Sequence, residues 1–186
     1  LNSIDGDWIL PNSPHSGQVD GSAEFEYVDA ALADVSKRYK IDPSRTVAAG
    51  FSAGGMLVWN LACAMPDRFA GFAPMSGTFW KAPPKSCAEP VANVVHIHGD
   101  ADKTVPLKGR KIAETHQGDV FQVIEMYSKL GNFDSDEVSS QNDLKCVDSK
   151  NPEGKILNFC LFNGGHSFRT EHLRYAWDTL ANAGQF

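Results

Sequence analysis

The feature that most constrains the fold is the segment 47–62, an apolar run interrupted by one serine between glycines. Its first part, Val47-Ala48-Ala49-Gly50, is short and apolar, which is typical of a buried strand. Ser52 follows inside a Gly-x-Ser-x-Gly pattern, and residues 56–62 are apolar enough for a buried helix. A sharp turn from strand to helix brings backbone close to backbone, where only glycine fits. The segment therefore predicts a strand, a tight turn at Ser52 and a helix.

The chemistry of such a turn suits a nucleophile. A serine hydroxyl is a weak nucleophile, so it must be held where a base can reach it, and a sharp turn exposes it in this way. The first N–H groups of the following helix have no partner within the helix, and we expect that of Ala53 to face a developing oxyanion. Because the five-residue pattern is common by chance, the interpretation of Ser52 as a nucleophile requires partner residues elsewhere in the chain.

Size and charge limit the classes of protein to which the chain can belong. Its 186 residues are enough for one domain with a proper core and too few for two of ordinary size, so we expect a single domain over residues 1–186. No apolar run reaches the length of a membrane span. The net charge of −6 and the isoelectric point near 5.4 argue against nucleic acid or an anionic membrane as a partner, since both require a basic patch.

Strands alternate with helices along most of the chain. Residues 1–21 lack periodicity and predict a loop, after which Ser22 is a suitable N-cap for the first helix. We expect helices at 22–39, 53–65, 108–116, 120–130 and around 173–180, and strands at 46–51, 71–77 with a turn, 92–98, 144–147 and 155–162. This alternation predicts an α/β fold with a mainly parallel sheet. In such sheets the functional groups gather at the carboxyl ends of the strands.

Two later strands end in residues that are candidate partners of Ser52. The strand at 92–98 leads into Gly99-Asp100-Ala101-Asp102, and the last strand leads into Gly164-Gly165-His166. A histidine takes the proton of the serine, and a carboxylate on its other nitrogen fixes its tautomer. The chain therefore predicts a triad in the order serine, aspartate, histidine. Both Asp100 and Asp102 remain candidates for the acid, with a mild preference for Asp102 because it lies further past the strand end.

Several motifs also resemble those of a known family. Gly50-Phe51-Ser52-Ala53-Gly54-Gly55-Met56, His98-Gly99-x-x-Asp102-x-x-Val105-Pro106, Gly164-Gly165-His166-Ser167 and Tyr39-x-Ile41-Asp42-Pro43-x-Arg45 are similar to motifs of the polyhydroxybutyrate depolymerase/feruloyl esterase group of α/β-hydrolases. The resemblance covers roughly residues 20–186. It implies the α/β-hydrolase fold, a triad of Ser52, Asp102 and His166, and ester hydrolysis through an acyl-enzyme. The implied substrate is a hydroxyalkanoate polyester or oligomer, or a feruloyl or acetyl ester on plant polysaccharide, and no cofactor or metal is implied.

The sequence departs from the family pattern at two places. His166-Ser167 is often followed by Trp-Pro in the family, but here by Phe168-Arg169. The family also supplies a second oxyanion donor from a His-Gly-type loop after an early strand, and no such unit precedes Ser52. We therefore expect residues 1–186 to be the carboxyl-terminal portion of a larger catalytic domain, whose N-terminal segment carries the first strands and the second donor.

Three aromatic residues are candidates for an acyl pocket. Phe79 and Trp80 follow the strand at 71–77, and Phe168 follows the predicted base. Aromatic side chains at strand ends suit the binding of an acyl group. They suit packing beneath a loop equally well, and the sequence does not choose between the two.

Four cysteines lack the Cys-x-x-Cys spacing of a zinc site or a redox dithiol. Cys146 and Cys160 lie on apolar runs that flank a turn, so cross-strand proximity is expected. We predict the disulfides Cys146–Cys160 and Cys63–Cys87, which would suit a secreted or periplasmic protein. The alternative is four buried thiols.

Other interpretations involve a metal, an amide substrate or no catalysis. His96 and His98 alternate along one strand and share a face, as two metal ligands could. The more ordinary interpretation makes His96 a buried strand residue and lets His98 support the loop that carries Asp102. A serine peptidase would use the same triad, and a binding protein could retain a hydrolase scaffold without catalysis.

Overall fold

The computed structural model describes residues 1, 3, 7–14, 17 and 19–184 of the chain. Its strands are β1 (Val47–Phe51), β2 (Gly71–Met75), β3 (Val94–Gly99), β4 (Arg110–Ile112), β5 (Thr115–Gln117), β6 (Asp134–Gln141), β7 (Leu144–Lys150) and β8 (Ile156–Phe162). Its α-helices are α1 (Ser22–Arg38), α2 (Ala53–Ala64), α3 (Val120–Gly131) and α4 (Thr170–Gly184). Short 3₁₀ turns cover Pro43–Arg45 and Pro66–Arg68.

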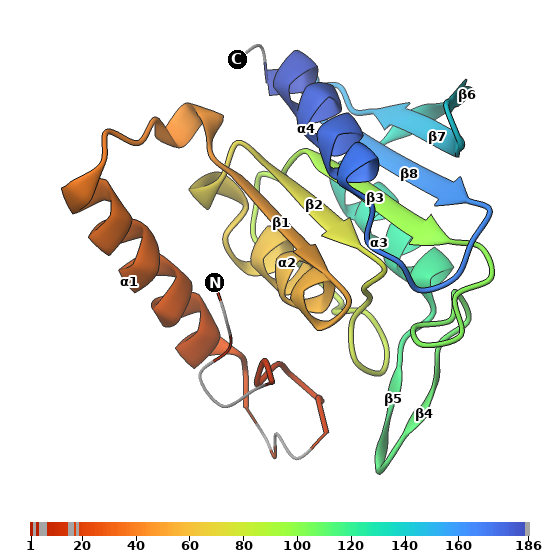
Figure 1. The fold of residues 1–186 in the computed structure, drawn as a ribbon, viewed down its shortest axis with the longest axis horizontal. Coiled ribbons are helices and arrows are strands. Elements are labelled where there is room, and N and C mark those ends of the chain that lie inside the picture. The colour runs from red at the N-terminus through yellow and green to blue at the C-terminus, as the bar shows by residue number, and fades with distance from the viewer. Residues whose placement is uncertain (2, 4–6, 15–16, 18, 185–186) are drawn as a thin grey trace.

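Six of the strands form one sheet in the order β1-β2-β3-β8-β7-β6 (Figure 1). The pairs β1–β2, β2–β3 and β3–β8 are parallel. The strands β7 and β6 pair antiparallel to their neighbours, and we call these two strands the antiparallel wing. The prediction of an α/β fold with a mainly parallel sheet is confirmed.

Helices cover both faces of the sheet and produce two hydrophobic cores. On one face α2 and α3 pack against the sheet and α1 lies beside β1, whereas α4 crosses the other face (Figure 1). Successive residues of a strand point to opposite faces, so Phe72 joins the first core and Ala73 the second. Trp59 of α2 is fully buried at the centre of the first core. The inner parallel strands β2 and β3 are therefore covered on both faces, which fixes the positions of their carboxyl ends.

The predicted helix over 108–116 is wrong. This segment contains β4 and β5, which pair antiparallel with Arg110 opposite Gln117. Gly109 has a φ of 70°, and a Cβ there would lie 2.1 Å from the carbonyl oxygen of Gln117. The antiparallel pairing of the two short strands outweighs the helical spacing of the sequence, and the left-handed conformation of Gly109 favours a turn at this point.

Two further local predictions need correction. The strand β6 was not expected, because its sequence Asp-Ser-Asp-Glu-Val-Ser-Ser-Gln is polar. It is an edge strand, and Val138, its sole large apolar residue, is 77% exposed. The second correction concerns Ser22, which begins α1 as its first helical residue; the N-cap is Gly21, with a φ of 83°. The left-handed conformation there suits glycine better than any other residue.

Both predicted disulfides are present. Cys146 and Cys160 lie opposite each other on β7 and β8, so their disulfide joins the antiparallel wing to the parallel strands. Cys63 and Cys87 join the last turn of α2 to the loop after β2. Among the helices that the structure describes, none combines the length and the apolar character needed to cross a bilayer.

Candidate active site

Ser52 lies at the junction of β1 and α2 in a strained conformation. Its φ of 59° and ψ of −121° fall in a region that residues with a side chain rarely adopt. A Cβ at Gly50 would lie 2.3 Å from the carbonyl oxygen of Gly54, and one at Gly55 would lie 2.5 Å from that of Met75. The predicted crowding is therefore present at Gly50 and Gly55. At Gly54 a Cβ would meet nothing within 4 Å among the described residues, so this part of the explanation for the motif is wrong.

The loops after β3 and β8 are joined by hydrogen bonds. The amide N of Ala101 donates to the carbonyl oxygen of Gly164 over 2.9 Å, and that of Gly164 donates to Oδ1 of Asp100 over 3.1 Å. Gly99 permits this contact, because a Cβ there would lie 2.4 Å from the carbonyl oxygen of Gly165. Asp100 thus links the two loops, and Asp102 is left to face the histidine.

Hydrogen bonds connect the three predicted triad residues in sequence. Nε2 of His166 lies 2.9 Å from Oγ of Ser52, and Nδ1 lies 2.7 Å from Oδ2 of Asp102. An ionised carboxylate can only accept, so Nδ1 carries the proton and Nε2 is left to accept from the serine hydroxyl. Three segments far apart in the sequence meet at the carboxyl ends of β1, β3 and β8, as expected for a parallel sheet.

The buried carboxylate of Asp102 is held by four hydrogen-bond or electrostatic partners. Burial alone would raise its pKa, but the hydrogen bonds from His166 and from the amides of Val105 and Thr104 outweigh burial and lower the pKa below its ordinary value. The amides of Thr104 and Val105 donate to Oδ1 over 2.8 and 2.9 Å. Nε2 of His98 lies 3.5 Å from Oδ2. Asp102 therefore stays ionised at neutral pH, as its orientation of His166 requires.

The predicted aromatic residues are placed differently from one another. Phe168 is 49% exposed and lies 6.0 Å from the ring of Phe51, which in turn lies 4.6 Å from the imidazole of His166. Phe79 is buried and packs on Trp59, which matches the packing alternative. Trp80 lines a cleft of about 460 Å³ beside the Cys63–Cys87 disulfide, to which no triad residue contributes. Of the three predicted aromatic residues, Phe168 is the one that contacts Phe51, the ring that packs on the imidazole of His166.

The amide of Ala53 is at the first position of α2, next to Oγ of Ser52, and the residue is exposed. Backbone N–H groups at the start of a helix lack an intrahelical acceptor and carry the positive end of the helix dipole. The position is therefore suited to stabilising an oxyanion that forms at Ser52.

His96 and His98 lie next to each other, with Nε2 of His96 3.0 Å from Nδ1 of His98. In the part of the chain that the structure describes, no group of three or more His, Cys, Asp or Glu side chains is arranged to hold a metal ion. Both rings are fully buried, and Nε2 of His98 lies 2.8 Å from the carbonyl oxygen of Val105. This geometry matches the interpretation in which His98 supports the loop of Asp102. The further partner of His96, Trp59, was not foreseen, because its spacing in the sequence indicates a core residue only.

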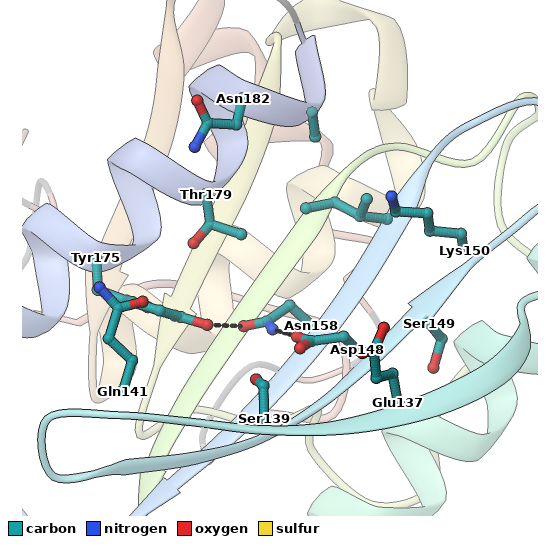
Figure 2. A pocket seen from close by; sticks show the side chains of 12 residues that line it. Glu137, Ser139, Gln141, Asp148, Ser149, Lys150, Asn158, Tyr175, Thr179 and Asn182 are labelled. Carbon is teal, nitrogen blue, oxygen red and sulfur yellow. Dashed lines mark hydrogen bonds between the residues drawn. The ribbon is translucent and has the colours of Figure 1, made fainter.

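A second, polar pocket of about 470 Å³ lies between the antiparallel wing and α4 (Figure 2). Asn158 is at its base, with Tyr175 and Asp148 hydrogen-bonded to it from either side. Ser139, Gln141 and Thr179 also line it. None of the predicted site residues is among its described lining residues.

The sequence profile of a family described as phospholipase/carboxylesterase matches residues 11–133, about two thirds of the chain. The chain belongs to this family. The match contains Ser52 and Asp102 but ends before His166. The α/β-hydrolase fold expected from the motifs is therefore confirmed for this phospholipase/carboxylesterase family member.

Two curated relatives of this chain have names that describe esterases. "Putative esterase NocK" of Nocardia uniformis subsp. tsuyamanensis is 30% identical over 113 residues, which cover 61% of this chain and 33% of that protein. "Probable feruloyl esterase C" of Aspergillus clavatus is 29% identical over 106 residues, which cover 55% of this chain and 37% of that protein. The resemblance to feruloyl esterases is confirmed. The chain spans about a third of the length of these curated relatives.

Among solved structures, the acetyl xylan esterase from Aspergillus awamori has a similar fold. The TM-score is 0.64 with 13% sequence identity, over 96% of this chain and 75% of that one. At this identity the similarity establishes the fold and nothing about the substrate.

Proposed function

We propose that the protein is a serine carboxylesterase that works through an acyl-enzyme. The observation that carries the proposal is the continuous hydrogen-bonded connection from Oγ of Ser52 through His166 to Asp102. The strained backbone of Ser52 supports it, because strain of this kind persists where a side chain must be held in one exposed position. Membership of the phospholipase/carboxylesterase family supports ester hydrolysis as the reaction.

In the proposed mechanism Ser52 attacks the ester carbonyl carbon while Nε2 of His166 takes the hydroxyl proton. Asp102 keeps the imidazole in the required tautomer and stabilises the imidazolium that forms. The amide of Ala53 donates to the oxyanion of the tetrahedral intermediate. His166 then gives its proton to the leaving alcohol. Water repeats the sequence on the acyl-enzyme, which releases the carboxylic acid and restores Ser52.

The proposal is tested with Ser52→Ala and short aryl esters. We expect kcat to fall by roughly 10⁴- to 10⁶-fold, as in comparable triads, because the acyl-enzyme can no longer form. Ser167→Ala, next to the base but outside the hydrogen-bonded triad, is the matched control and should retain activity. A loss below about tenfold in Ser52→Ala would place the nucleophile elsewhere, and wild-type protein without Ser52-dependent turnover would favour a binding protein on a hydrolase scaffold.

For the substrate we propose a feruloyl or acetyl ester on plant polysaccharide, or a hydroxyalkanoate polyester or oligomer. The relative named a feruloyl esterase supports the first class, and the motif resemblance supports both. Phe168 is the proposed contact to the acyl group, because it is exposed and lies beside the ring that packs on His166. For Phe79 and Trp80 the observed placement favours packing. Comparison of methyl ferulate, aryl esters of increasing chain length and peptide anilides distinguishes these substrates, and preferential hydrolysis of the anilides would indicate a serine peptidase.

We also propose that residues 1–186 form one part of the catalytic domain. The strand β1 is at the edge of the sheet, and a groove of about 750 Å³ runs along it, lined by apolar residues of α1, β1 and α2 that include Val28, Leu32, Ala48, Leu57 and Leu61. An edge strand beside an apolar groove is suited to pairing with a further strand. In our proposal a segment on this side supplies that strand and the second oxyanion donor. An intact mass of the natural protein equal to the 20.3 kDa of these residues would contradict the proposal.

The two disulfides support a secreted or periplasmic location, since such bonds form and persist in oxidising compartments. Fractionation of the source cells tests the location. Recovery of the oxidised protein from the reducing cytosol alone would contradict it.

A further inference from the structure

A line of buried polar groups runs from α2 across β3 to the loop of Asp102. Nε1 of Trp59 lies 3.1 Å from Nδ1 of His96, and Nε2 of His96 lies 3.0 Å from Nδ1 of His98. Nε2 of His98 then lies 2.8 Å from the carbonyl oxygen of Val105. All three side chains are fully buried. We call Trp59, His96 and His98 the buried polar line.

The two ends of the buried polar line determine where every proton lies. The indole N–H of Trp59 can only donate, so Nδ1 of His96 must accept and Nε2 of His96 must carry the proton. That N–H donates to Nδ1 of His98, so His98 in turn carries its proton on Nε2 and donates to the carbonyl oxygen of Val105. One tautomer of each ring satisfies all of these contacts.

The line stays neutral at neutral pH. A proton added to either ring would make two N–H groups face each other, at Trp59 and His96 or at His96 and His98. Burial, and then the neighbouring His98, hold the pKa of His96 well below its ordinary value. Burial also lowers the pKa of His98, although the Val105 carbonyl and Asp102 act in the opposite direction and His166 adds to the lowering.

His98, at one end of the buried polar line, contacts the turn that contains Asp102. Oδ1 of Asp102 is occupied by the amides of Thr104 and Val105, so Oδ2 is left to bind His166. The Nε2–H of His98 donates to Val105 and lies 3.5 Å from this same Oδ2. In the opposite tautomer His98 would present a lone pair to two oxygen acceptors. Repulsion would then push the turn, and Oδ2 with it, away from its present position.

We propose that Trp59 and His96 are positioning residues of the esterase site, because they hold His98 in the one tautomer that keeps the Asp102 turn in register with His166. The proposal rests on the proposed esterase function for its kinetic consequences. Buried polar groups that are fully satisfied specify one arrangement, whereas an apolar replacement at His96 removes the donor to Nδ1 of His98 and leaves the Val105 carbonyl and Asp102 alone to select its tautomer.

The test compares two substitutions of similar size, His96→Gln and His96→Leu. A glutamine amide accepts through its oxygen and donates through its nitrogen, so it can take the indole proton and donate to His98 as His96 does. Leucine does neither. We expect kcat for a short aryl ester to fall by roughly 10- to 100-fold in His96→Leu, the effect of a small misplacement of a catalytic group. The KM should change little, and His96→Gln should restore most of the loss.

The pH dependence of kcat separates positioning from a general loss of stability. A displaced carboxylate stabilises the imidazolium less well, so the acid limb of the profile should move to lower pH in His96→Leu but not in His96→Gln. Tyr127→Phe is the matched control. Tyr127 is buried and its hydroxyl bonds the backbone of Ala92, so removal of the hydroxyl lowers stability, while the ring that packs edge-on against Trp59 is kept and no hydrogen bond of the line is lost. An acid limb that moves equally in Tyr127→Phe would overturn the proposal.

A spectroscopic measurement tests the line without any need for turnover. Nitrogen-detected NMR of the histidine rings should show His96 and His98 protonated on Nε2 in the wild type. The amide resonances of Thr104 and Val105 should move in His96→Leu and in Trp59→Phe, and stay close to wild type in His96→Gln. Unmoved turn amides in His96→Leu, or the opposite tautomers in the wild type, would refute the positioning role. Absence of Ser52-dependent turnover would refute the esterase function instead.

Discussion

In the parallel part of the sheet, β2 and β3 are buried along their whole length, whereas in the antiparallel wing β7 alternates between buried and exposed residues and β6 is an edge strand. Three of the parallel strands, β1, β3 and β8, end at the proposed triad. The wing instead borders the polar pocket at α4 (Figure 2). Of the strands that end at the proposed triad, β3 and β8 are buried along nearly their whole length, whereas β1 is an edge strand whose end is fixed by the close packing of Gly50 on the first turn of α2. Burial on both faces and the proposed chemistry therefore coincide at β3 and β8 and are absent from the wing.

The largest expected difference is in kcat, between a variant that loses a carboxylate beside the parallel strands and one that loses a carboxylate in the antiparallel wing. In Asp102→Asn the amide favours the wrong tautomer of His166, so kcat should fall by roughly 10⁴-fold. In Asp148→Asn, on the wing, kcat should stay within about twofold, because substitutions away from a site usually change free energies by about 0.5 kcal/mol or less. Steady-state kinetics on an aryl ester measures both. Comparable losses of kcat in the two variants would contradict the assignment of the chemistry to the ends of the parallel strands.

Truncation of an apolar side chain should lower the free energy of unfolding much more in the parallel part of the sheet than in the antiparallel wing. Phe72→Ala, on β2, removes a fully buried ring and should lower the free energy of unfolding by about 3–5 kcal/mol. Val138→Ala, on β6, removes methyl groups that are mostly in water and should change it by about 0.5 kcal/mol or less. Urea unfolding measures both values. A loss at Val138 as large as that at Phe72 would mean that a partner covers β6.

Removal of the Cys146–Cys160 disulfide should loosen the wing and leave the triad intact. The bond closes a loop of 14 residues in sequence separation, for which chain-entropy arguments give about 3 kcal/mol of stabilisation. We expect Cys146→Ala/Cys160→Ala to lose about this much unfolding free energy with kcat unchanged. Cys63→Ala/Cys87→Ala, at the end of the helix that begins at Ser52, is the comparison variant. Loss of kcat in the wing variant, measured well below its unfolding temperature, would connect the wing to the site.

The histidines of β3 should make stability depend on pH, whereas β6 and β7 contain no histidine. Burial depresses the pKa of His96 and His98 in the folded state, so only the unfolded chain takes up their protons near pH 6.5. Stability is therefore complete above about pH 6.5 and falls below it, by up to about 1.4 kcal/mol per pH unit for each ring. His96→Gln should reduce this slope and the exposed-residue control His116→Gln should not. Equal slopes in wild type and His96→Gln would show that His96 is protonated in the folded state.

Local signals account for most of the elements. The glycines and small residues at 47–55 predicted β1, the turn and α2, and the segment at 92–98 predicted the strand observed as β3, because both patterns depend on near neighbours alone. The same reasoning failed at 108–116 and at β6. In the first case a chance helical spacing was outweighed by antiparallel pairing with a neighbouring segment. In the second, a polar edge strand was ordered by its pairing with β7, which no local pattern reports.

Residue type, spacing and family motifs were enough to predict the α/β class, the two disulfide pairs, and Ser52 and His166 as members of a triad, with Asp102 favoured over Asp100 by the family motif. The folded structure was needed to show that Asp100 links two loops while Asp102 faces His166, that Phe79 is a core residue while Phe168 lies beside the ring that packs on His166, and that Trp59 reaches Asp102 through two histidines. The hydrogen bonds of Asp100 and Asp102 among these contacts join residues 64 positions apart. Their geometry depends on how helices and strands pack in three dimensions, which short-range patterns in a chain do not encode.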